Sequence, residues 1–577
     1  MTEIRLLSQH IEVAMTLSST PAEKNDPSAG GKNDVGELER RTRPPTDHSS
    51  DDVKSEDADA DGDDEQEGHE RLQAQPSNAD SIWVAEHMGL GREIAFIALV
   101  CMAQFTTQFG LGATTNILHI IGETYGITDS GKLSWLVAGY SLTVGTFILF
   151  SGRLGDAFGY KKMLLIGYAW FALWTLVTGC SVYSSFVLHV FARVLQGIGP
   201  AICLPNALAI FGAAYPPGNR KAMAFSLFGA TAPVGSIAGT VYSAGWSYLW
   251  WPWAYWSMSI GVTLVAIAAY FVIPTPSQRA RREAQHQSWQ TRVWELDLPG
   301  AVTGITALVL INFAWNQAPI TGWDNPACIT TLILGFVLIP VFFYIELHVA
   351  KKPLLPLEAV NGDVAFVLAI VACGWATFGI WYFYLFQIIQ QLRHAPPLLT
   401  SAYFSPVVIS GVIAAVATGF LLRRLSPPIV MTGALIAFLI GIILIATLPP
   451  HQIYWGQMFV CLIVMPFGMD MSFPAATIIL SDAVKKEHQG IAASLVNTVV
   501  NYGISLGLGF AGTVEVNINP GGTSPEAILK GYRAALYLGI GLSVLGLAIS
   551  LCFLLKVHWR DPKKKAAEEA SSSEMEA

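Results

Sequence analysis

The sequence predicts an all-α membrane protein whose helices cross the bilayer fourteen times. Hydrophobic residues make up 52% of the 577-residue chain and charged residues only 13%. Soluble domains average about 25% charged residues, so composition alone indicates a membrane protein. From residue 93 onward, apolar runs follow one another with short polar breaks, and most reach the roughly 20 residues that one helical crossing needs.

Residues 1–91 differ in composition from the rest, because they are rich in Asp, Glu, Ser, Pro and Gly and poor in aromatic residues. Such a segment cannot bury enough apolar surface to offset the entropy lost on ordering. Much of the net charge of -8 comes from residues 51–70, where Lys54 is the only basic residue. We therefore expect a disordered, acidic cytoplasmic tail.

The predicted spans fall into groups of six, two and six, and a long polar break separates the first six from the two that follow. They cover residues 94–121, 133–150, 163–180, 186–213, 222–243, 250–273, 298–315, 329–349, 364–389, 401–422, 429–448, 453–480, 490–516 and 534–557. After the tail we expect a six-helix bundle, a cytoplasmic linker, two extra helices, a second six-helix bundle and a cytoplasmic carboxyl-terminal tail. These parts correspond to residues 92–273, 274–296, 297–360, 361–558 and 559–577.

Basic residues lie preferentially in the cytoplasmic loops of membrane proteins, and this chain follows that bias if its amino terminus is cytoplasmic. Both termini are then cytoplasmic, and moving the register by one helix would invert the bias. The outer loops contain only Lys132, Arg393, Lys530 and Arg533. The inner loops contain Arg153, Lys161, Lys162, Arg220, Lys221, Arg279, Arg281, Arg282, Arg292, Lys351, Lys352, Arg423, Arg424, Lys485 and Lys486.

The stretch GRLGDAFGYKK, between the second and third predicted spans, combines glycines, basic residues and an aspartate. Its basic residues indicate a cytoplasmic turn, and its glycines permit a tight turn and close helix approach because they lack a Cβ. An ordinary cytoplasmic turn would explain the lysines but not the glycines and the aspartate together. The residues of this predicted gating hairpin are Gly152, Arg153, Gly155, Asp156, Gly159, Lys161 and Lys162.

The hairpin resembles the loop between the second and third helices of the major facilitator superfamily. That pattern is glycine-x-leucine-aspartate-x-x-glycine with trailing basic residues, and here Gly155 is inserted before Asp156. The resemblance implies two pseudo-symmetric six-helix bundles, latched on the cytoplasmic side by the aspartate and its basic partners. The segment GFLLRR at Gly419–Arg424 is a weak counterpart in the second bundle. A total of fourteen helices resembles the larger of the drug:proton antiporter families.

Arg193 lies inside the fourth apolar run, where exposure to lipid is costly, so we expect it to face a partner or a water-filled cavity. Gln196, Gly197 and Gly199 follow it. Together they resemble the superfamily's fourth-helix pattern of arginine, then glutamine-glycine-x-glycine, in which the arginine is linked to proton coupling. The alternative is an ion pair inside the bundle with no role in transport.

The fifth run, FGATAPVGSIAGT, partly resembles the glycine-rich, proline-kinked motif of drug antiporters. Ala232 replaces the glycine expected before the proline, and the terminal glycine pair is missing, so the motif favours export less strongly than a full match would. Its G-x-x-x-G spacing predicts close packing on a neighbouring helix. The matching residues are Gly229, Pro233, Gly235 and Gly239.

Asp470 is a carboxylate in the apolar run PFGMDMSFPAATIIL, which we place in the cytoplasmic half of the twelfth span. Pro474, one turn later, leaves the backbone carbonyl of Asp470 without its helical donor. Ionisable residues within membrane spans are costly and typically functional. We therefore predict that Asp470 is a proton carrier or a cation site. The alternative is a charge held against Arg193 or another basic group.

Polar and aromatic residues of the first and ninth runs are predicted to line a cavity for planar or weakly polar solutes. Packing of the same side chains on lipid and neighbouring helices is the alternative. An aspartate that many fourteen-helix drug antiporters have in the first helix is absent here. The cavity candidates are Gln104, Gln108, Asn116, Trp375, Trp381, Tyr384 and Gln387.

Several segments, among them FAWNQAPITGW and GMDMSFPAA, resemble a fungal branch of the superfamily that contains aminotriazole-resistance and low-affinity ammonium or borate transporters. The resemblance implies export of small toxic compounds or drugs in exchange for protons, at the plasma membrane or alternatively the vacuolar membrane. The rival interpretation is uptake of ammonium, borate or another small nutrient. A more remote one is a non-transporting sensor.

No phosphate-binding loop of the form G-x-x-x-x-G-K-[ST] occurs, so the sequence does not predict an ATP-driven pump. We expect no enzyme activity, no catalytic or metal-binding residues, and no cofactor other than a proton gradient. The expected partners are a small solute, protons and the lipid bilayer, without nucleic acid. We expect a monomer.

Overall fold

The computed structural model describes residues 88–216, 218–274, 296–350, 353–355, 362–483 and 489–576. Within these ranges the chain is helical and contains no strand, and fourteen helices are long and apolar enough to cross a membrane. The predicted number of spans is therefore confirmed. Most of the predicted amino-terminal tail, and the predicted linker apart from its first and last residues, lie outside the described residues.

The first bundle extends from α2 to α9, and capping side chains mark where two of its helices begin. Asp129 accepts a hydrogen bond from the Gly131 amide at the start of α4, and Ser185 accepts one from Leu188 at the start of α6. The elements are α2 (Leu90–Asn116), α3 (Leu118–Thr124), α4 (Ser130–Phe158), α5 (Tyr160–Cys180), η2 (Ser181–Tyr183), α6 (Phe186–Gln196), α7 (Ile198–Ala214), α8 (Asn219–Ser247) and α9 (Pro252–Val272).

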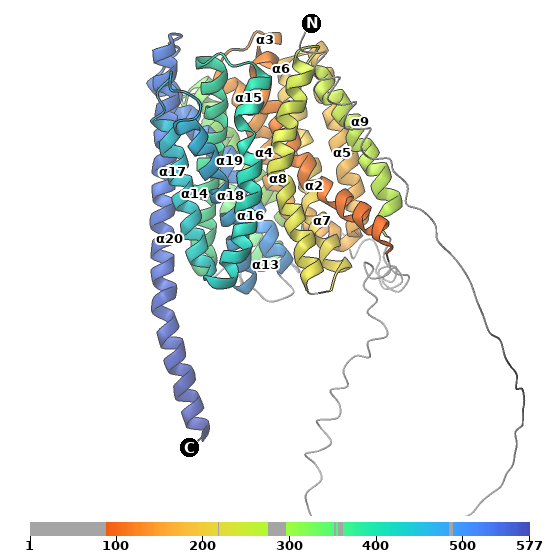
Figure 1. The fold of residues 1–577 in the computed structure, drawn as a ribbon, viewed down its shortest axis with the longest axis vertical. Helices are drawn as coiled ribbons and strands as arrows, with labels where there is room; N and C mark the ends of the chain where they lie inside the picture. Colours follow the sequence, from red (N-terminus) through yellow and green to blue (C-terminus); the bar gives the residue numbers. More distant parts are fainter. Residues whose placement is uncertain are drawn as a thin grey trace, which may run out of the picture. The chain divides into compact units, whose positions relative to one another are not determined.

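The second bundle extends from α14 to α20, and two extra helices precede it. Its elements are α14 (Gly362–Gln387), the π-helical turn η4 (Ile388–Leu392), α15 (Pro397–Phe404), α16 (Pro406–Arg424), α17 (Pro427–Ala446), α18 (Gln457–Ala483), α19 (Gln489–Ile518) and α20 (Pro525–Glu576). The extra helices are α12 (Leu298–Thr321) and α13 (Pro326–His348), and α12 packs on α13, on α4 and on α19. Helix α20 continues past residue 558 through the segment expected as a carboxyl-terminal tail (Figure 1).

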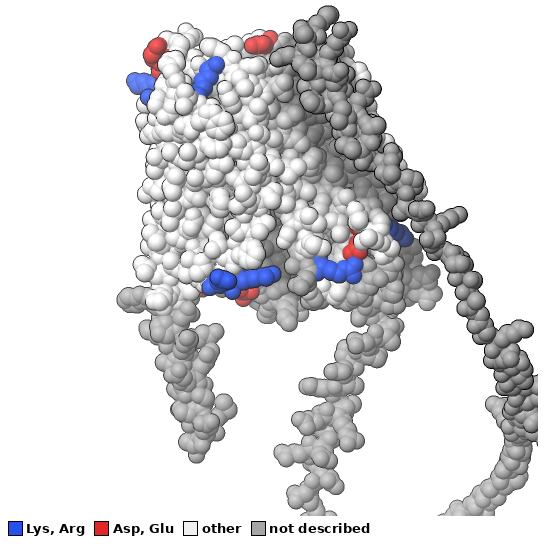
Figure 2. All heavy atoms as spheres, viewed as in Figure 1, with Lys and Arg blue, Asp and Glu red and all other residues white. Residues whose placement is uncertain are grey.

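Successive helices cross the bundle in alternate directions, which defines its two ends. The α3 end contains α3, η4 and the start of α15, whereas the Gly159 end contains the turn between α4 and α5 (Figure 1). On the face drawn in Figure 2, charged side chains gather near these two ends and the band between them has none. This distribution is the one expected when a bilayer surrounds the middle of the bundle.

The two bundles meet along α4 and α19, and along α8 with α15 and α16. The α4–α19 contact is close: a Cβ added at Gly145 would lie 2.8 Å from the backbone nitrogen of Tyr502. Ser505 of α19 donates a hydrogen bond to the carbonyl of Ala138 at 2.8 Å, and its oxygen lies 2.9 Å from Asn312 Oδ1 of α12. The extra helix α12 therefore contacts the seam between the bundles.

Within the first bundle, α2 and α8 approach each other closely where both have glycines. A Cβ added at Gly235 would lie 2.5 Å from the Phe105 carbonyl oxygen, and one at Gly239 would lie 2.2 Å from that of Phe109. Both distances are too short for any side chain. The predicted packing role of the G-x-x-x-G spacing is therefore confirmed.

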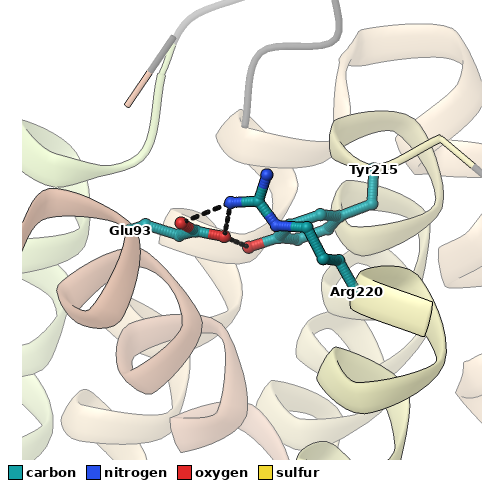
Figure 3. A network of polar contacts seen from close by, with 3 residues as sticks. All are labelled: Glu93, Tyr215 and Arg220. Atoms are coloured by element: carbon teal, nitrogen blue, oxygen red, sulfur yellow. Dashed lines mark hydrogen bonds and ion pairs between the residues drawn. The ribbon is translucent and has the colours of Figure 1, made fainter. Parts of the chain in front are cut away.

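A polar network joins the starts of α2 and α8 at the Gly159 end (Figure 3). Arg220 Nη2 lies 2.7 and 2.8 Å from the two carboxylate oxygens of Glu93, and Tyr215 donates a hydrogen bond to the same carboxylate at 3.1 Å. Burial and the contact with Glu93 raise the pKa of Tyr215, so this phenol stays protonated and remains a donor at neutral pH. The network fixes the Gly159 end of the first bundle.

Candidate functional site

The predicted gating hairpin is mostly helix, which corrects the expected loop. Because α4 continues to Phe158 and α5 begins at Tyr160, Gly159 with φ of 98° is the whole turn. A glycine inside a helix costs only about 1 kcal/mol relative to alanine, and helix packing offsets that cost. A Cβ added at Gly155 would lie 2.0 Å from Asn206 Oδ1, so this glycine lets α4 approach α7.

The polar residues of the hairpin contact carbonyl groups, a phenol and aromatic rings. Arg153 donates to the carbonyl of Pro353 at 2.5 Å, beyond α13, and Lys161 donates to the carbonyl of Ile273 at 2.5 Å. Asp156 accepts a hydrogen bond from Tyr160 at 2.9 Å, and Lys162 Nζ lies 5.9 Å from the centre of the Phe158 ring. A latch from Asp156 to the second bundle stays a prediction.

Arg193 is fully buried on α6, and its partners lie in the first bundle. Nε donates to the carbonyl of Leu136 at 3.1 Å, and Nη1 donates to Gln196 Oε1 at 2.5 Å. The guanidinium carbon lies 4.4 Å from the centre of the Tyr140 ring, a cation–π contact. Gln196 in turn donates to Thr175 Oγ1 at 2.6 Å. A main-chain carbonyl, an amide oxygen and a ring face therefore surround the guanidinium of Arg193, whereas its Nη2 is buried without a hydrogen-bond partner among the described residues.

The two glycines after Gln196 permit close helix contacts around this arginine. A Cβ added at Gly197 would lie 2.4 Å from the Tyr140 carbonyl oxygen, and one at Gly199 would lie 2.6 Å from Phe171 Cβ. The fourth predicted span is also interrupted at Gly197, where α6 ends and α7 begins. The arginine–glutamine–glycine pattern thus forms one tightly packed unit.

Asp470 lies midway along α18, and its expected place in the cytoplasmic half of the membrane span stays a prediction. Its Oδ2 is enclosed and has no hydrogen-bond partner within the described part of the chain, although the residue is partly exposed. Among the described residues Asp470 forms no ion pair with Arg193, whose partners are those given above. A charge held against another basic group stays an open alternative.

The proline of the fifth-helix motif lies beside Asp470, across the seam between the bundles. A Cβ added at Gly411 of α16 would lie 3.1 Å from Pro233 Cβ and 3.3 Å from Asp470 Oδ2. Gly411 is therefore the residue that lets α8, α16 and the Asp470 carboxylate come together. Gly229, by contrast, has open space around the position of a Cβ.

Four of the predicted cavity residues form contacts inside the protein in this conformation. Trp381 donates to Cys461 Sγ at 3.0 Å, Tyr384 donates to Glu515 at 2.7 Å, and Asn116 donates to the Thr240 carbonyl at 2.8 Å. Gln387 is also buried, whereas Gln104, Gln108 and Trp375 are half-buried.

The structure has a groove between α5 and α9, but the predicted cavity residues do not line it. Its lining includes Leu173, Leu176, Ile267 and Phe271, which are exposed apolar side chains. Such a surface is suited to contact lipid rather than a weakly polar solute. The prediction of a substrate cavity in the first and ninth spans is therefore not tested by this conformation.

Sequence reasoning missed Glu515, a buried carboxylate near the end of α19. The residue lies inside the predicted span 490–516, so the same reasoning that singled out Asp470 applied to it. Its partners come from α4 and α14, far away in the sequence. Those partners could not be found from sequence spacing.

The fold and these buried charges define a class of protein, a helical membrane protein of two bundles with ionisable groups in its interior. The sequence profile of the Major Facilitator Superfamily matches residues 100–508 and 427–575. The chain therefore belongs to the Major Facilitator Superfamily and is a membrane transporter of that superfamily.

Three fungal relatives show what this chain resembles. It is 52% identical over 473 residues to the low affinity ammonium transporter of Saccharomyces cerevisiae, covering 82% of this chain and 90% of that protein. It is 42% identical over 505 residues to the efflux pump terG of Aspergillus terreus, covering 87% and 94%. It is 38% identical over 485 residues to the aminotriazole resistance protein of S. cerevisiae, covering 83% and 87%.

Among solved structures, the peptide transporter POT in complex with sulfate is similar to this chain with a TM-score of 0.57. The match covers 82% of this chain and 98% of that protein, at 14% sequence identity. At that identity the likeness concerns the fold alone.

Proposed function

We propose that this transporter exports small toxic compounds across the plasma membrane in exchange for protons, with both termini in the cytoplasm. The two bundles would open alternately at the α3 end, facing the exterior, and at the Gly159 end, facing the cytoplasm. Arg193 and Asp470 would serve proton coupling, and the Gly152–Lys162 stretch would serve gating.

The surroundings of Asp470 are the observation that most supports this proposal. A carboxylate enclosed among apolar side chains is costly when charged, unless a cation or a donor compensates it. Asp470 Oδ2 has no such partner within the described residues, and Pro233 of the other bundle lies just across Gly411. A proton on Asp470 would remove this cost next to Gly411, where α16 packs near Pro233 of the first bundle.

The relatives support two directions of transport. The efflux pump terG and the aminotriazole resistance protein support export of a small toxic compound. The ammonium transporter, at 52% identity, supports the second candidate, a carrier for ammonium or a similar small cation. The missing first-helix aspartate and the incomplete fifth-helix motif also favour this second candidate.

Accumulation assays in a strain that lacks the gene and in one that overexpresses it separate the two candidates. Cells are loaded with labelled aminotriazole or with labelled methylammonium, at an acidic and at a neutral external pH. Export predicts that overexpression lowers the aminotriazole content, and lowers it more at acidic pH. A rise in methylammonium content with no change in aminotriazole would favour uptake and overturn the export proposal.

A further inference from the structure

Glu515 joins the two bundles at the α3 end. Its Oε1 lies 2.6 Å from the hydroxyl of Ser130, the first residue of α4, and its Oε2 lies 2.7 Å from the hydroxyl of Tyr384 on α14. Ser130 belongs to the first bundle, whereas Glu515 and Tyr384 belong to the second. Opening of the α3 end must therefore break the contact between Ser130 and Glu515.

The groups that face Glu515 do not supply a positive charge. They are Asp129 before α4, Tyr384 on α14 and Tyr532 on α20, and a Cβ added at Gly531 of α20 would lie 3.3 Å from Glu515 Cγ. The ion pairs between described residues do not include Glu515. Arg533 of α20 donates to the Leu448 carbonyl at 3.1 Å.

The position of Glu515 in its own helix adds to the cost of a negative charge. The residue is 8% exposed and lies in the last turn of α19, where the helix dipole is unfavourable to an anion. The amino-terminal end of α4 and the two hydroxyl groups oppose this effect in part. A neutral carboxylic acid removes the cost and keeps both contacts, because a serine hydroxyl both donates and accepts.

We propose that Glu515 is a proton-binding site of the gate at the α3 end, and that it holds a proton while that end is closed. The acid O–H on Oε1 then donates to Ser130, while Oε2 accepts from Tyr384. When the end opens, Ser130 leaves, water replaces it, and Glu515 gives its proton to that water. This inference rests on the proposed alternation of the two bundles.

A second contact at the same end has no ionisable group, so it does not depend on pH. Asn116 donates to Ser401 Oγ at 3.2 Å, and Gln390 donates to the Asn116 carbonyl at 2.7 Å. Both contacts join α2 of the first bundle to the second bundle. The ionisable groups on which closure at this end can depend are therefore Glu515, the carboxylate beside it, Asp129, and His119 of α3, whose side chain contacts Gln387 of α14.

The distance across the gate is the quantity to measure. Spin-labelled, bio-orthogonal residues at the exposed positions Thr128 and Asn517 leave the seven native cysteines in place. Distance distributions are recorded for the full-length chain in lipid nanodiscs at about pH 5 and about pH 8. We expect the ratio of closed to open populations to rise about fivefold or more at the lower pH.

Three variants isolate the carboxylate. Glu515→Gln, which keeps a donor and an acceptor without a charge, is expected to be closed at both pH values. Ser130→Ala is expected to shift the populations towards the open state at both, and Asp129→Asn to retain the pH dependence. A Glu515→Gln protein that is more open than the parent would overturn the proposal.

Two further outcomes distinguish this inference from the proposed function. If two distances are observed but the ratio of their populations does not change with pH, the role of Glu515 is overturned and the alternation of the bundles is left intact. A single distance under all conditions, together with no solute flux in liposomes, would overturn the proposed function and this inference with it.

Discussion

Arg193 and Asp470 are both ionisable residues in the middle of predicted spans, but their surroundings differ. Arg193 in the first bundle has two acceptors and an aromatic face within contact distance, and only its Nη2 lacks a partner within the described residues. Asp470 in the second bundle has an enclosed Oδ2 that lacks a donor within the described residues. The arginine contacts its own bundle, whereas the aspartate lies next to Gly411, which touches Pro233 of the other bundle.

This difference separates two uses of a buried charge. A charge with several close partners, such as Arg193, stabilises the fold through those contacts, so its removal should weaken the fold as well as impair coupling. An uncompensated carboxylate can be neutralised by a proton or a bound cation, so its removal should mainly affect coupling.

Replacement of Arg193 by alanine is expected to have the largest effect on stability. It leaves the Gln196 side chain and the Leu136 carbonyl without their donor, at about 1–3 kcal/mol for each buried group. The midpoint of thermal unfolding in detergent, followed by tryptophan fluorescence, should fall markedly. An Arg193→Ala protein as stable as the parent would show that these contacts do not stabilise the fold.

Replacement of Gly411 by alanine is expected to affect transport more than stability. The added Cβ would lie 3.1 Å from Pro233 and 3.3 Å from Asp470, so the seam must shift by a few tenths of an ångström. We expect less than about 1 kcal/mol of destabilisation and a loss of flux of about threefold to tenfold. Gly419→Ala on the same helix, where a Cβ meets open space, is the matched control and should transport normally.

Replacement of Thr175 by valine is expected to have the smallest effect. It removes the acceptor of the Gln196 side chain at similar volume and should destabilise by about 1 kcal/mol. Gradient-driven flux should be preserved, because Arg193 keeps its own partners. A loss of flux without a change in unfolding temperature would mean that the contact between Gln196 and Thr175 itself takes part in coupling.

Sequence reasoning predicted the membrane spans well, because the cost of exposing polar groups to lipid imposes long apolar runs. It predicted the close approach at Gly235 and Gly239 for a similar reason, since only glycine permits it. It was wrong about the loop at residues 152–162, because glycine is compatible with a helix when packing supports it.

The partners of the buried charges could not be predicted, because they depend on how distant helices pack. Nothing in the sequence places Leu136 and Tyr140 beside Arg193 rather than Asp470. The aromatic residues of the ninth span are of types that occur equally in the lining of a cavity and in a packed interior. Only the structure shows that Trp381 donates a hydrogen bond to Cys461 in this conformation.

The most direct test of the uncompensated carboxylate compares two modes of transport in proteoliposomes containing the Asp470→Asn protein. We predict that accumulation of labelled solute driven by a pH gradient falls about tenfold or more. Exchange of labelled for unlabelled solute without a gradient should be retained. Asp482→Asn, an exposed carboxylate on the same helix, is the control and should behave as the parent does. Gradient-driven accumulation that is unchanged in the Asp470→Asn protein would contradict the account.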